Sequence, residues 1–284
     1  MVQPHTQPGS PAYPAPAAPP AEEGPAWDGG TLRGDPHERA DKARRVRDMF
    51  TAIAGKYDLN NRVHSFGQDQ RWRQATVRAA GLKAGHRVVD VACGTGDLTV
   101  AFADAMASLG SGAGAEAGRP PVVGIDYTLA MLPIAVTKTA RRFTEHSAAV
   151  YLQADAMRLP LPDASADVLS IAFGIRNVAD PELALSEFKR VLRPGGRLLI
   201  LEFSEPKNRL IGFFDRVYRK GVMPWTATLL AGDRSGAYRY LPRSVSTFQT
   251  ADELADSVER AGFDRPTQKP LTFGVATLHR AIRP

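Results

Sequence analysis

The chain has 284 residues, of which 43% are hydrophobic and 23% are charged, which is typical of a globular protein with one or two domains. Its single cysteine, Cys93, excludes an internal disulfide framework and favours a reducing compartment. The formal net charge of +6 is compatible with a nucleic acid, an anionic membrane surface or an acidic small molecule as partner. No segment is apolar for long enough to span a bilayer.

Residues 1–36 are rich in proline, alanine and glycine and almost lack large apolar side chains. Such a segment cannot bury enough surface to offset its ordering entropy, so we expect a disordered tail with polyproline II character and no function of its own. The first nine residues have neither a basic region nor an apolar core, and no secretory signal is expected. We place a single folded domain at 37–284.

Two helices and a loop are predicted after the tail. Apolar side chains recur at helical spacing over His37–Asp58 and again over Gln68–Ala80. Between them, Lys56–Gly67 combines hydrogen-bonding and aromatic side chains. This composition favours a loop that covers a pocket, rather than a plain turn. We therefore interpret residues 37–82 as a helical lid.

From residue 87 onward, β-branched strands alternate with amphipathic helices. This alternation predicts βαβ units, that is, a parallel sheet with helices on both faces. The expected strands are Arg87–Ala92, Val122–Asp126, Val150–Asp155, Asp167–Phe173 and Arg197–Phe203, and the expected helices are Gly96–Leu109, Thr128–Arg142 and Asp180–Leu192.

Residues 207–248 break this rhythm. Their unusually apolar stretch, Leu210–Leu230, contains several basic residues and is interpreted as a cap insertion. Its apolar side chains could line a site for a prenyl tail or simply pack on the core, and both readings stay open. A helix over Gln249–Ala261 and an antiparallel hairpin of Thr267–Phe273 with Val275–Ile282 complete the chain.

The strand Arg87–Ala92 runs into the turn Gly94-Thr95-Gly96, and a helix follows at once. In an open parallel sheet this is the usual place for a ligand, because glycine lets the backbone come close and the helix start presents free N–H groups. The turn serves nucleotides, dinucleotides and S-adenosylmethionine alike, so alone it does not decide between them.

Acidic residues at successive strand ends narrow the choice of ligand. Asp126 ends the second strand, where a carboxylate can accept bonds from ribose hydroxyls. Asp155 follows the third strand and could accept from an exocyclic amine while Ala156 packs on the ring, and Asp90 would face the amino group of a methionine-like moiety. These negative groups favour the cationic sulfonium of S-adenosylmethionine over a pyrophosphate as the ligand. No metal is expected.

These residues carry a family resemblance. Asp90–Gly96, with the two acids at the following strand ends, resembles class I S-adenosylmethionine-dependent methyltransferases. More narrowly, Ala172–Val178 and Arg190–Ser204 are similar to the UbiE/MenG-type quinone C-methyltransferases of menaquinone and ubiquinone biosynthesis. The resemblance covers residues 40–284. It implies a Rossmann-like α/β fold with a mostly parallel seven-stranded sheet and a C-terminal antiparallel hairpin.

The resemblance also implies that Thr95, Asp126, Asp155 and Ala156 contact S-adenosylmethionine. Together with the turn, these give the predicted cofactor-binding residues. They are Asp90, Gly94, Thr95, Gly96, Asp126, Asp155 and Ala156.

Four positions depart from the family pattern. Asn60 replaces a methionine, His64 an aliphatic residue and Asp69 a histidine. Ala172 stands where ubiquinone-type members have a serine that can touch the cofactor, so it cannot be a side-chain ligand. The missing serine favours the menaquinone-type branch.

Catalysis on a quinol ring requires stabilisation of a developing phenolate and an in-line approach of two carbons. We predict that Arg176 donates to the oxyanion and that Asn177 orients a ring oxygen or a water, although the pair could instead anchor the loop. Tyr57 completes the predicted catalytic set. The base stays open between Tyr57, Asp58, His64 and an arginine-held water, with His64 expected at the surface.

The expected activity is methylation of demethylmenaquinol to menaquinol, with a prenylated quinol as partner. The alternatives are the benzoquinol of ubiquinone biosynthesis, another phenolic or lipid acceptor, and a non-catalytic S-adenosylmethionine-binding scaffold in a quinone-synthesis complex. No nucleic acid partner is expected, because Phe173–Arg176 stands where nucleic-acid methyltransferases carry Asn/Asp-Pro-Pro-Tyr/Phe. We expect a cytoplasmic enzyme in peripheral contact with anionic lipid at the inner face of the cytoplasmic membrane. The oligomeric state is left open.

Overall fold

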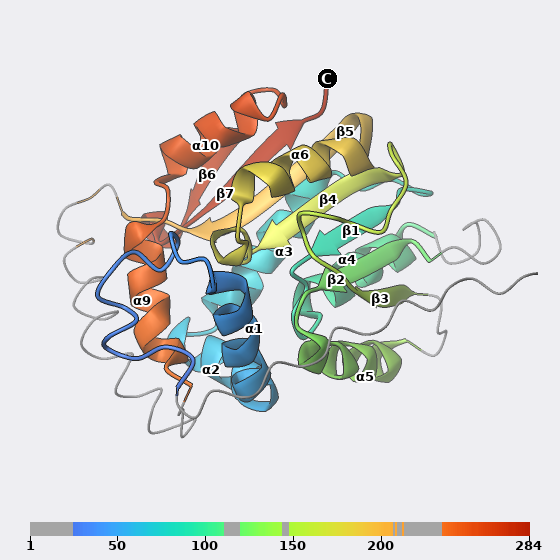
Figure 1. Ribbon diagram of the computed structural model, residues 1–284. Helices are drawn as coiled ribbons and strands as arrows, with labels where there is room; N and C mark the ends of the chain where they lie inside the picture. The colour runs from blue at the N-terminus through green and yellow to red at the C-terminus, as the bar shows by residue number, and fades with distance from the viewer. Residues whose placement is uncertain (1–24, 111–119, 144–147, 207, 209–211, 213–234) are drawn as a thin grey trace, which may run out of the picture.

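A seven-stranded sheet with helices on both faces forms the centre of the structure (Figure 1). The computed structural model describes residues 25–110, 120–143, 148–206, 208, 212 and 235–284. The strands are β1 (Val88–Val91), β2 (Val122–Asp126), β3 (Ala149–Gln153), β4 (Ala166–Ala172), β5 (Leu192–Phe203), β6 (Thr267–Leu271) and β7 (Ala276–Ile282).

The strand order is β3-β2-β1-β4-β5-β7-β6. The first five strands of this order run parallel, and β7 pairs antiparallel with both β5 and β6. This confirms the predicted mostly parallel sheet with a C-terminal antiparallel pair. Because the order reverses between β1 and β4, the carboxyl ends of these two strands are where an open α/β sheet receives its ligand.

The pleat of the sheet explains the two halves of the core. Val88 points toward one face, while Val89 points toward the other, and the neighbouring strands alternate in the same way. Helices α3 (Gln68–Ala80) and α4 (Asp97–Ser108) cover the first face, and α6 (Pro181–Val191) and α10 (Ala251–Arg260) cover the second. Strands buried on both faces read as continuous apolar runs, which is why β1 and β2 were recognisable from sequence.

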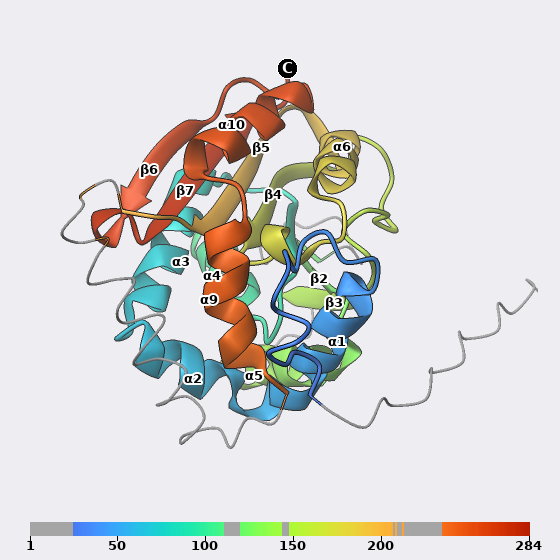
Figure 2. The same ribbon diagram turned by 60° about the vertical axis from the view of Figure 1, so that its left-hand side comes forward.

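Three further helices lie across the carboxyl ends of the strands. These are α1 (Lys42–Ile53), α2 (Tyr57–His64) and α9 (Ala237–Thr247), which Figure 2 shows side by side. Helix α5 (Leu132–Arg142) packs beside β3 and α4. Among the residues described, no helix has the length and apolar character needed to cross a membrane.

The prediction of a loop over Lys56–Gly67 was wrong, because α2 occupies most of this segment. The helix expected over His37–Asp58 correspondingly begins at Lys42 and ends at Ile53. Helix α2 was missed because its aliphatic side chains are few and exposed. Leu59 and Val63 face solvent, while polar side chains of the same helix, such as Asn60 and His64, face inward. With only two aliphatic residues among eight, the helix carries too short an apolar pattern to be recognised from sequence.

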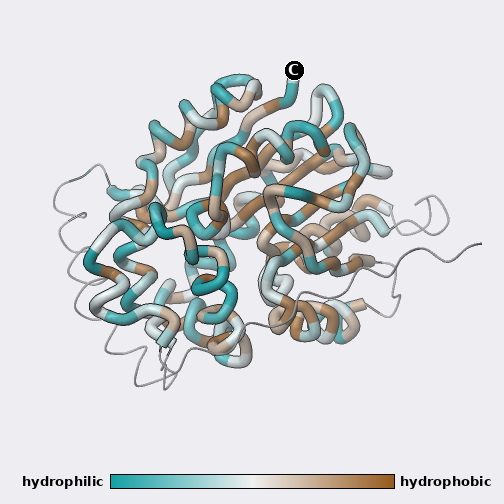
Figure 3. Tube along the Cα trace, in the orientation of Figure 1, coloured by the Kyte–Doolittle hydropathy of each residue, from teal (hydrophilic) through white to brown (hydrophobic). Residues whose placement is uncertain are grey.

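The tail expected over 1–36 also differs from the structure in its last part. Residues 1–24 lie outside the described residues, but residues 25–36 form turns in which Trp27 is fully buried. One large aromatic side chain thus orders a segment whose composition otherwise predicts disorder. The apolar stretch assigned to the cap insertion, Leu210–Leu230, lies almost entirely outside the described residues, whereas α9 belongs to the described part. Figure 3 shows the apolar residues concentrated in the strands.

Candidate active site

A cavity of about 800 Å³, counted with its mouth, opens at the carboxyl ends of β1, β2 and β4 beneath α1. Backbone and side chains from both halves of the sheet meet here, as the topology requires. The lid contributes Ala43, Val46, Phe50 and Tyr57 to the lining of this cavity. The sheet side contributes Val91, Ala92, Gly94, Asp126, Tyr127, Thr128, Met131, Ala154, Asp155, Ala156, Met157, Ala172, Phe173, Gly174, Asn177, Val178 and Ala179.

Strained backbone brings the ends of β1 and β4 together in this cavity. Ala92 and Phe173 have φ angles of +52° and +56°, a left-handed conformation that residues with side chains rarely adopt. Gly174 lies so close that a Cβ at this position would be 2.5 Å from the Cβ of Ala92. Such strain clusters at binding sites, where the surrounding structure holds it in place.

The two glycines of the Gly-x-Gly turn have different surroundings. Gly94 has a φ of +56°, and a Cβ there would lie 3.9 Å from the ring of Tyr57, on the cavity side. Gly96 has a φ of +84°, and its Cβ would lie 2.8 Å from the Cβ of Ala135 and 2.9 Å from Oη of Tyr151. Gly94 therefore borders the cavity, whereas Gly96 allows α5 and β3 to pack against the turn.

Asp126 holds the turn and lines the cavity at the same time. Its Oδ2 accepts from the N–H of Gly94 and its Oδ1 from the N–H of Thr128, each at 2.7 Å. Burial raises the pKa of Asp126, while these two N–H groups oppose the rise. Asp155 accepts from the N–H of Met157 at 2.9 Å and lines the same cavity. Both carboxylates keep lone pairs for a ligand.

The described lining of this cavity contains two carboxylates, Asp126 and Asp155, and no lysine, arginine or histidine. A pyrophosphate in such a place would have no cation to offset its charge. A cationic ligand with hydroxyl and amine donors would instead find acceptors, and apolar side chains such as Ala156 and Met157 would contact its ring. The cavity therefore fits a sulfonium nucleoside.

Three of the predicted cofactor-binding residues do not line the cavity. Asp90 is buried beneath the turn, where its carboxylate accepts from Oγ1 of Thr99 and Oγ of Ser170, both at 2.7 Å. The hydroxyl of Thr95 donates to Oδ1 of Asp58 at 2.5 Å, and Gly96 faces α5 as described. The structure thus places Asp90 and Thr95 in the support of the turn, and their contact with a cofactor stays a prediction.

A second cavity of about 1080 Å³, mouth included, lies between α1, α2, α3, α9 and the end of β5. Its walls are mainly aromatic and aliphatic, with two buried guanidinium groups, those of Arg73 and Arg176. Phe50, Tyr57 and Phe173 line both cavities and so form the boundary between them. The arrangement can hold a polar ligand in one cavity and an apolar one in the other, with their ends facing each other.

Arg176 is held at the wall of the second cavity by a buried ion pair. Its Nη1 lies 2.6 Å from Oε1 of Glu202, at the end of β5, and donates to the carbonyl of Phe173 at 2.8 Å. The guanidinium lies 5.3 Å from the ring centroid of Phe203. Burial raises the pKa of Glu202, and the charge of Arg176 counteracts that rise. Sequence reasoning missed Glu202, although a lone acid near the end of an apolar strand was a usable signal.

Asn177 lines the first cavity, so the predicted pair Arg176-Asn177 lies across the boundary. The amide Nδ2 of Asn177 donates to the carbonyl of Phe173 at 3.2 Å, and its Oδ1 accepts from the hydroxyl of Tyr240 at 2.9 Å. Tyr240 belongs to α9 and to the stretch Tyr238–Leu241, which extends the family resemblance, but no role at the site was predicted for it. Only the tertiary structure brings it to a residue 63 positions earlier in the chain.

The three candidate bases of the lid have different environments. Burial raises the pKa of Tyr57, which disfavours its phenolate and hence a role as a base. Asp58 is engaged by Thr95 and by Lys138, whose Nζ lies 2.6 Å from Oδ2 of Asp58. The expectation that His64 is a surface residue was wrong, because it is half-buried and lines the second cavity, with Nδ1 2.8 Å from the carbonyl of Asn60.

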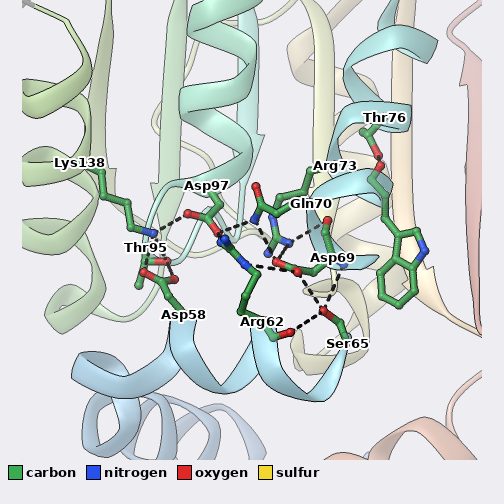
Figure 4. Close-up of polar contacts among 11 residues, drawn as sticks. Asp58, Arg62, Ser65, Asp69, Gln70, Arg73, Thr76, Thr95, Asp97 and Lys138 are labelled. Atoms are coloured by element: carbon green, nitrogen blue, oxygen red, sulfur yellow. Dashed lines mark hydrogen bonds and ion pairs between the residues drawn. The ribbon is translucent and has the colours of Figure 1, made fainter. Parts of the chain in front are cut away.

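Charged side chains connect the lid to the Gly-x-Gly turn in a continuous network (Figure 4). Lys138 contacts Asp58 of α2 and, at 2.5 Å, Asp97 in the first turn of α4. Gln70 of α3 donates to both Asp97 and Asp69, at 3.1 and 3.0 Å. The lid thus rests on the turn through side chains from four separate helices, α2, α3, α4 and α5.

Comparisons with known proteins agree with this geometry. The ubiE/COQ5 methyltransferase family matches residues 38–283. A demethylmenaquinone methyltransferase of Thermus thermophilus is 45% identical over 236 residues, which are 83% of this chain and all of that protein. The ubiquinone/menaquinone biosynthesis C-methyltransferase UbiE of Azotobacter vinelandii is 39% identical over 86% of this chain and 91% of its own length.

Solved structures show the same fold. A SAM-dependent methyltransferase from Aquifex aeolicus superposes with a TM-score of 0.55 over 82% of this chain and 97% of that one. The two sequences are 19% identical, so this likeness concerns the fold alone.

Proposed function

The chain belongs to the ubiE/COQ5 methyltransferase family, and on that premise we propose that it transfers a methyl group to a ring carbon of demethylmenaquinol, giving menaquinol. The chain is an S-adenosylmethionine-dependent C-methyltransferase, in keeping with its family and fold. The observation that carries the choice of substrate is a 45% identity with a protein named demethylmenaquinone methyltransferase, which is matched over the whole length of that protein.

The first cavity is proposed to hold the cofactor, which supplies an electrophilic methyl group. Asp126 and Asp155 offer the carboxylate acceptors, Gly94 leaves room beside the turn, and Ala156 contributes an apolar wall. Asp90, Thr95 and Gly96 complete the proposed binding set, with Asp90 and Thr95 supporting the turn from below. Exclusion of basic side chains from the described lining supports this assignment.

The second cavity is proposed to hold the quinol. Its aromatic walls suit a planar ring and the adjoining apolar chain, and buried Arg176 offers donors to a ring oxygen as negative charge develops. Asn177 would orient the same ring from the cofactor side, and Tyr57 would fix the ring at the boundary of the two cavities. A guanidinium stays protonated throughout, so Arg176 stabilises charge and does not itself take the proton.

The benzoquinol of ubiquinone biosynthesis is the second candidate substrate. A relative at 39% identity carries both quinones in its name. Ala172 lines the cofactor cavity without a hydroxyl, which favours the menaquinone-type reaction.

Contact with a membrane surface is proposed because the substrate carries a prenyl tail. Leu59, Val63 and Phe66 are 58%, 41% and 76% exposed and come at helical spacing on and just after α2, next to the second cavity. Exposed apolar side chains beside an apolar cavity are suited to an interface with lipid. We place the enzyme in the cytoplasm, at the inner face of the membrane. Flotation with anionic liposomes tests this, and a protein that stays at the bottom of the gradient with and without quinol would contradict it.

The activity is tested with labelled S-adenosylmethionine and either reduced demethylmenaquinone or its benzoquinol counterpart. We expect label in the naphthoquinol and at least tenfold less in the benzoquinol. Arg176→Ala and Asn177→Ala should each lower turnover by about 100-fold, a typical loss when an oxyanion donor is removed, with cofactor binding retained by calorimetry. Arg71→Ala, at an exposed position on α3, is the matched control. Full turnover by both site variants would contradict the catalytic assignment and favour a binding scaffold.

A further inference from the structure

A segment that precedes the family match is packed along helix α9. The match to the family begins at residue 38, whereas the described chain begins at residue 25. Residues 25–37, the strap, run beside α9 and α1 in Figure 2. The strap therefore lies outside the part that its family shares, and nothing in the family's activity explains it.

Trp27 anchors the strap at the start of α9. Its ring stacks on that of Tyr240, with centroids 4.5 Å apart and planes 23° from parallel, and the residue is fully buried. The N–H of Trp27 donates to the carbonyl of Ser235 at 3.0 Å. Gly236, with a φ of +82°, leaves so little room that a Cβ there would overlap the carbonyl oxygen of Trp27. The first turn of α9 is thus shaped to receive this tryptophan.

The rest of the strap follows α9 to its far end. His37 Nε2 lies 2.8 Å from the carbonyl of Ser244, and Arg243 donates to the carbonyl of Gly34 at 3.2 Å. A guanidinium nitrogen of Arg45 on α1 donates to the carbonyl of Ala26 at 2.9 Å, which joins the strap to the lid as well. Contacts at both ends of one helix fix its position relative to the lid.

The residue that receives Trp27 also touches the proposed catalytic pair. The hydroxyl of Tyr240 donates to Oδ1 of Asn177 at 2.9 Å, and Tyr240 lines the second cavity. Because Oδ1 accepts this bond, the amide of Asn177 can have only one orientation, with Nδ2 directed to the carbonyl of Phe173. Burial raises the pKa of Tyr240, so the phenol keeps its proton and remains a donor.

We propose that the strap is a positioning element of the substrate cavity, in which Trp27 fixes Tyr240 and Tyr240 in turn orients Asn177 toward the reacting ring. The proposal rests on the proposed function in so far as Asn177 contacts substrate. Trp27 itself touches neither cavity. Its effect on turnover is therefore transmitted through Tyr240.

Truncations and point variants test the strap separately from the fold. A chain that starts at Pro25 keeps the strap and should show the kcat of the full chain, whereas one that starts at Glu38 should lose at least tenfold. Trp27→Ala should lower kcat by about tenfold and change the KM for quinol and the Kd for S-adenosylmethionine by less than threefold, since a misplaced orienting group affects mainly the chemical step. Trp27→Phe, which can still stack, should restore most of the kcat.

Tyr240→Phe removes one hydroxyl and keeps the stacked ring, so it tests the relay even if Trp27→Ala does not fold. It should lower kcat about tenfold, and adding Trp27→Ala should lower it little further, because both changes act on one contact. An unchanged kcat in Tyr240→Phe, or losses that multiply in the double variant, would overturn the relay.

Hydrogen exchange separates failure of this proposal from failure of the proposed function. If the unaltered chain does not methylate a quinol, the proposed function fails, yet the strap can still be measured. Trp27→Ala should then raise amide exchange in residues 174–178 at least tenfold, with Trp27→Phe close to the unaltered chain. If residues 174–178 exchange at the same rate in the unaltered chain, Trp27→Ala and Trp27→Phe, the positioning role of the strap is overturned.

Discussion

Nη1 of Arg176 lies 2.6 Å from Oε1 of Glu202, and the two side chains are 5% and 2% exposed. Removing both charges from water is costly, and their attraction only partly offsets that loss. In the described structure, Nε of Arg176 and Oε2 of Glu202 have no hydrogen-bond partner. A pair with unsatisfied atoms is a poor source of stability, so its value lies in holding the guanidinium at the wall of the second cavity.

Glu202→Gln should be strongly destabilising because it leaves the charge of Arg176 buried without a counter-charge. Loss of one partner of a buried pair typically costs about 3–5 kcal/mol, so we expect the free energy of unfolding to fall by about 3 kcal/mol. The matched control is Glu182→Gln, which breaks the exposed pair with Arg260 and should cost less than about 1 kcal/mol. Urea denaturation measures both, and equal losses would contradict the importance of the buried pair.

Asp90→Asn should change how stability depends on pH. Burial raises the pKa of Asp90 from 3.8 to about 6, despite the bonds from Thr99 and Ser170. The native state then holds the proton more tightly than the unfolded chain. The unaltered protein therefore loses stability as the pH rises from the unfolded-state pKa of 3.8 past the native-state pKa of about 6, by about 3 kcal/mol in total. The asparagine variant has no such loss.

The stability of Asp90→Asn relative to the unaltered chain should therefore rise by about 2 kcal/mol between pH 4 and pH 7 and change little above pH 7. Urea denaturation at each pH, without cofactor, measures this difference directly. The groups that titrate in both proteins cancel in the comparison. A difference that does not vary with pH would show that Asp90 ionises normally.

The sheet and the acids that line the first cavity could be predicted because their signals are local. Strands β1, β2 and β4 are short, largely apolar runs, and acids mark the ends of neighbouring strands. Asp126 is the last residue of β2, and Asp155 lies two residues after β3. Strand ends in a parallel sheet share one edge, so sequence order alone places these acids together. The helix Gln68–Ala80 was predicted to the residue from side chains that recur on one face, and in the structure a left-handed glycine stands at each of its ends.

The contacts around the second cavity were harder to predict because they join distant segments. Glu202 meets Arg176 across 26 positions, and Tyr240 meets Asn177 across 63. The burial of Trp27 depends on a gap above Gly236 that no local pattern indicates. Composition correctly suggests disorder when large apolar residues are rare, but a single tryptophan with a preformed place to bind is enough to reverse it.

Gly96→Ala should destabilise the protein although the substitution adds only a methyl group. The new Cβ would lie 2.8 Å from Ala135 and 2.9 Å from Tyr151, and the φ of +84° is unfavourable for alanine. Overpacking and backbone strain each cost about 1–3 kcal/mol, so we expect a loss of about 2–4 kcal/mol by denaturation. Gly55→Ala is the control, since nothing lies within 4 Å of its Cβ position, and it should be neutral or slightly stabilising. Similar effects of both substitutions would contradict this account.

The ammonium of Lys138 joins the lid to the cofactor turn. Its Nζ lies 2.6 Å from Asp58 on α2, 2.5 Å from Asp97 on α4 and 3.1 Å from Oγ1 of Thr95. The three charged side chains are 17–32% exposed, so solvent screens their attraction only in part. Without this cation, Asp58 and Asp97 would repel each other across the point where the lid meets the turn.

Lys138→Met should therefore loosen the lid over the cofactor cavity. We expect S-adenosylmethionine to dissociate about tenfold faster, because an aliphatic side chain of similar length keeps the packing but removes the short ion pairs of both carboxylates. Among the described residues, Asp97 then keeps as an ion pair only the longer contact, 3.7 Å, with the guanidinium of Arg62. Asp58→Asn in the same chain should recover part of the loss by removing the repulsion. Stopped-flow displacement of the bound cofactor measures the rate, with Lys83→Met, at an exposed position, as the control. A dissociation rate that is the same in Lys138→Met and in the control would mean that the lid is held by its apolar contacts alone.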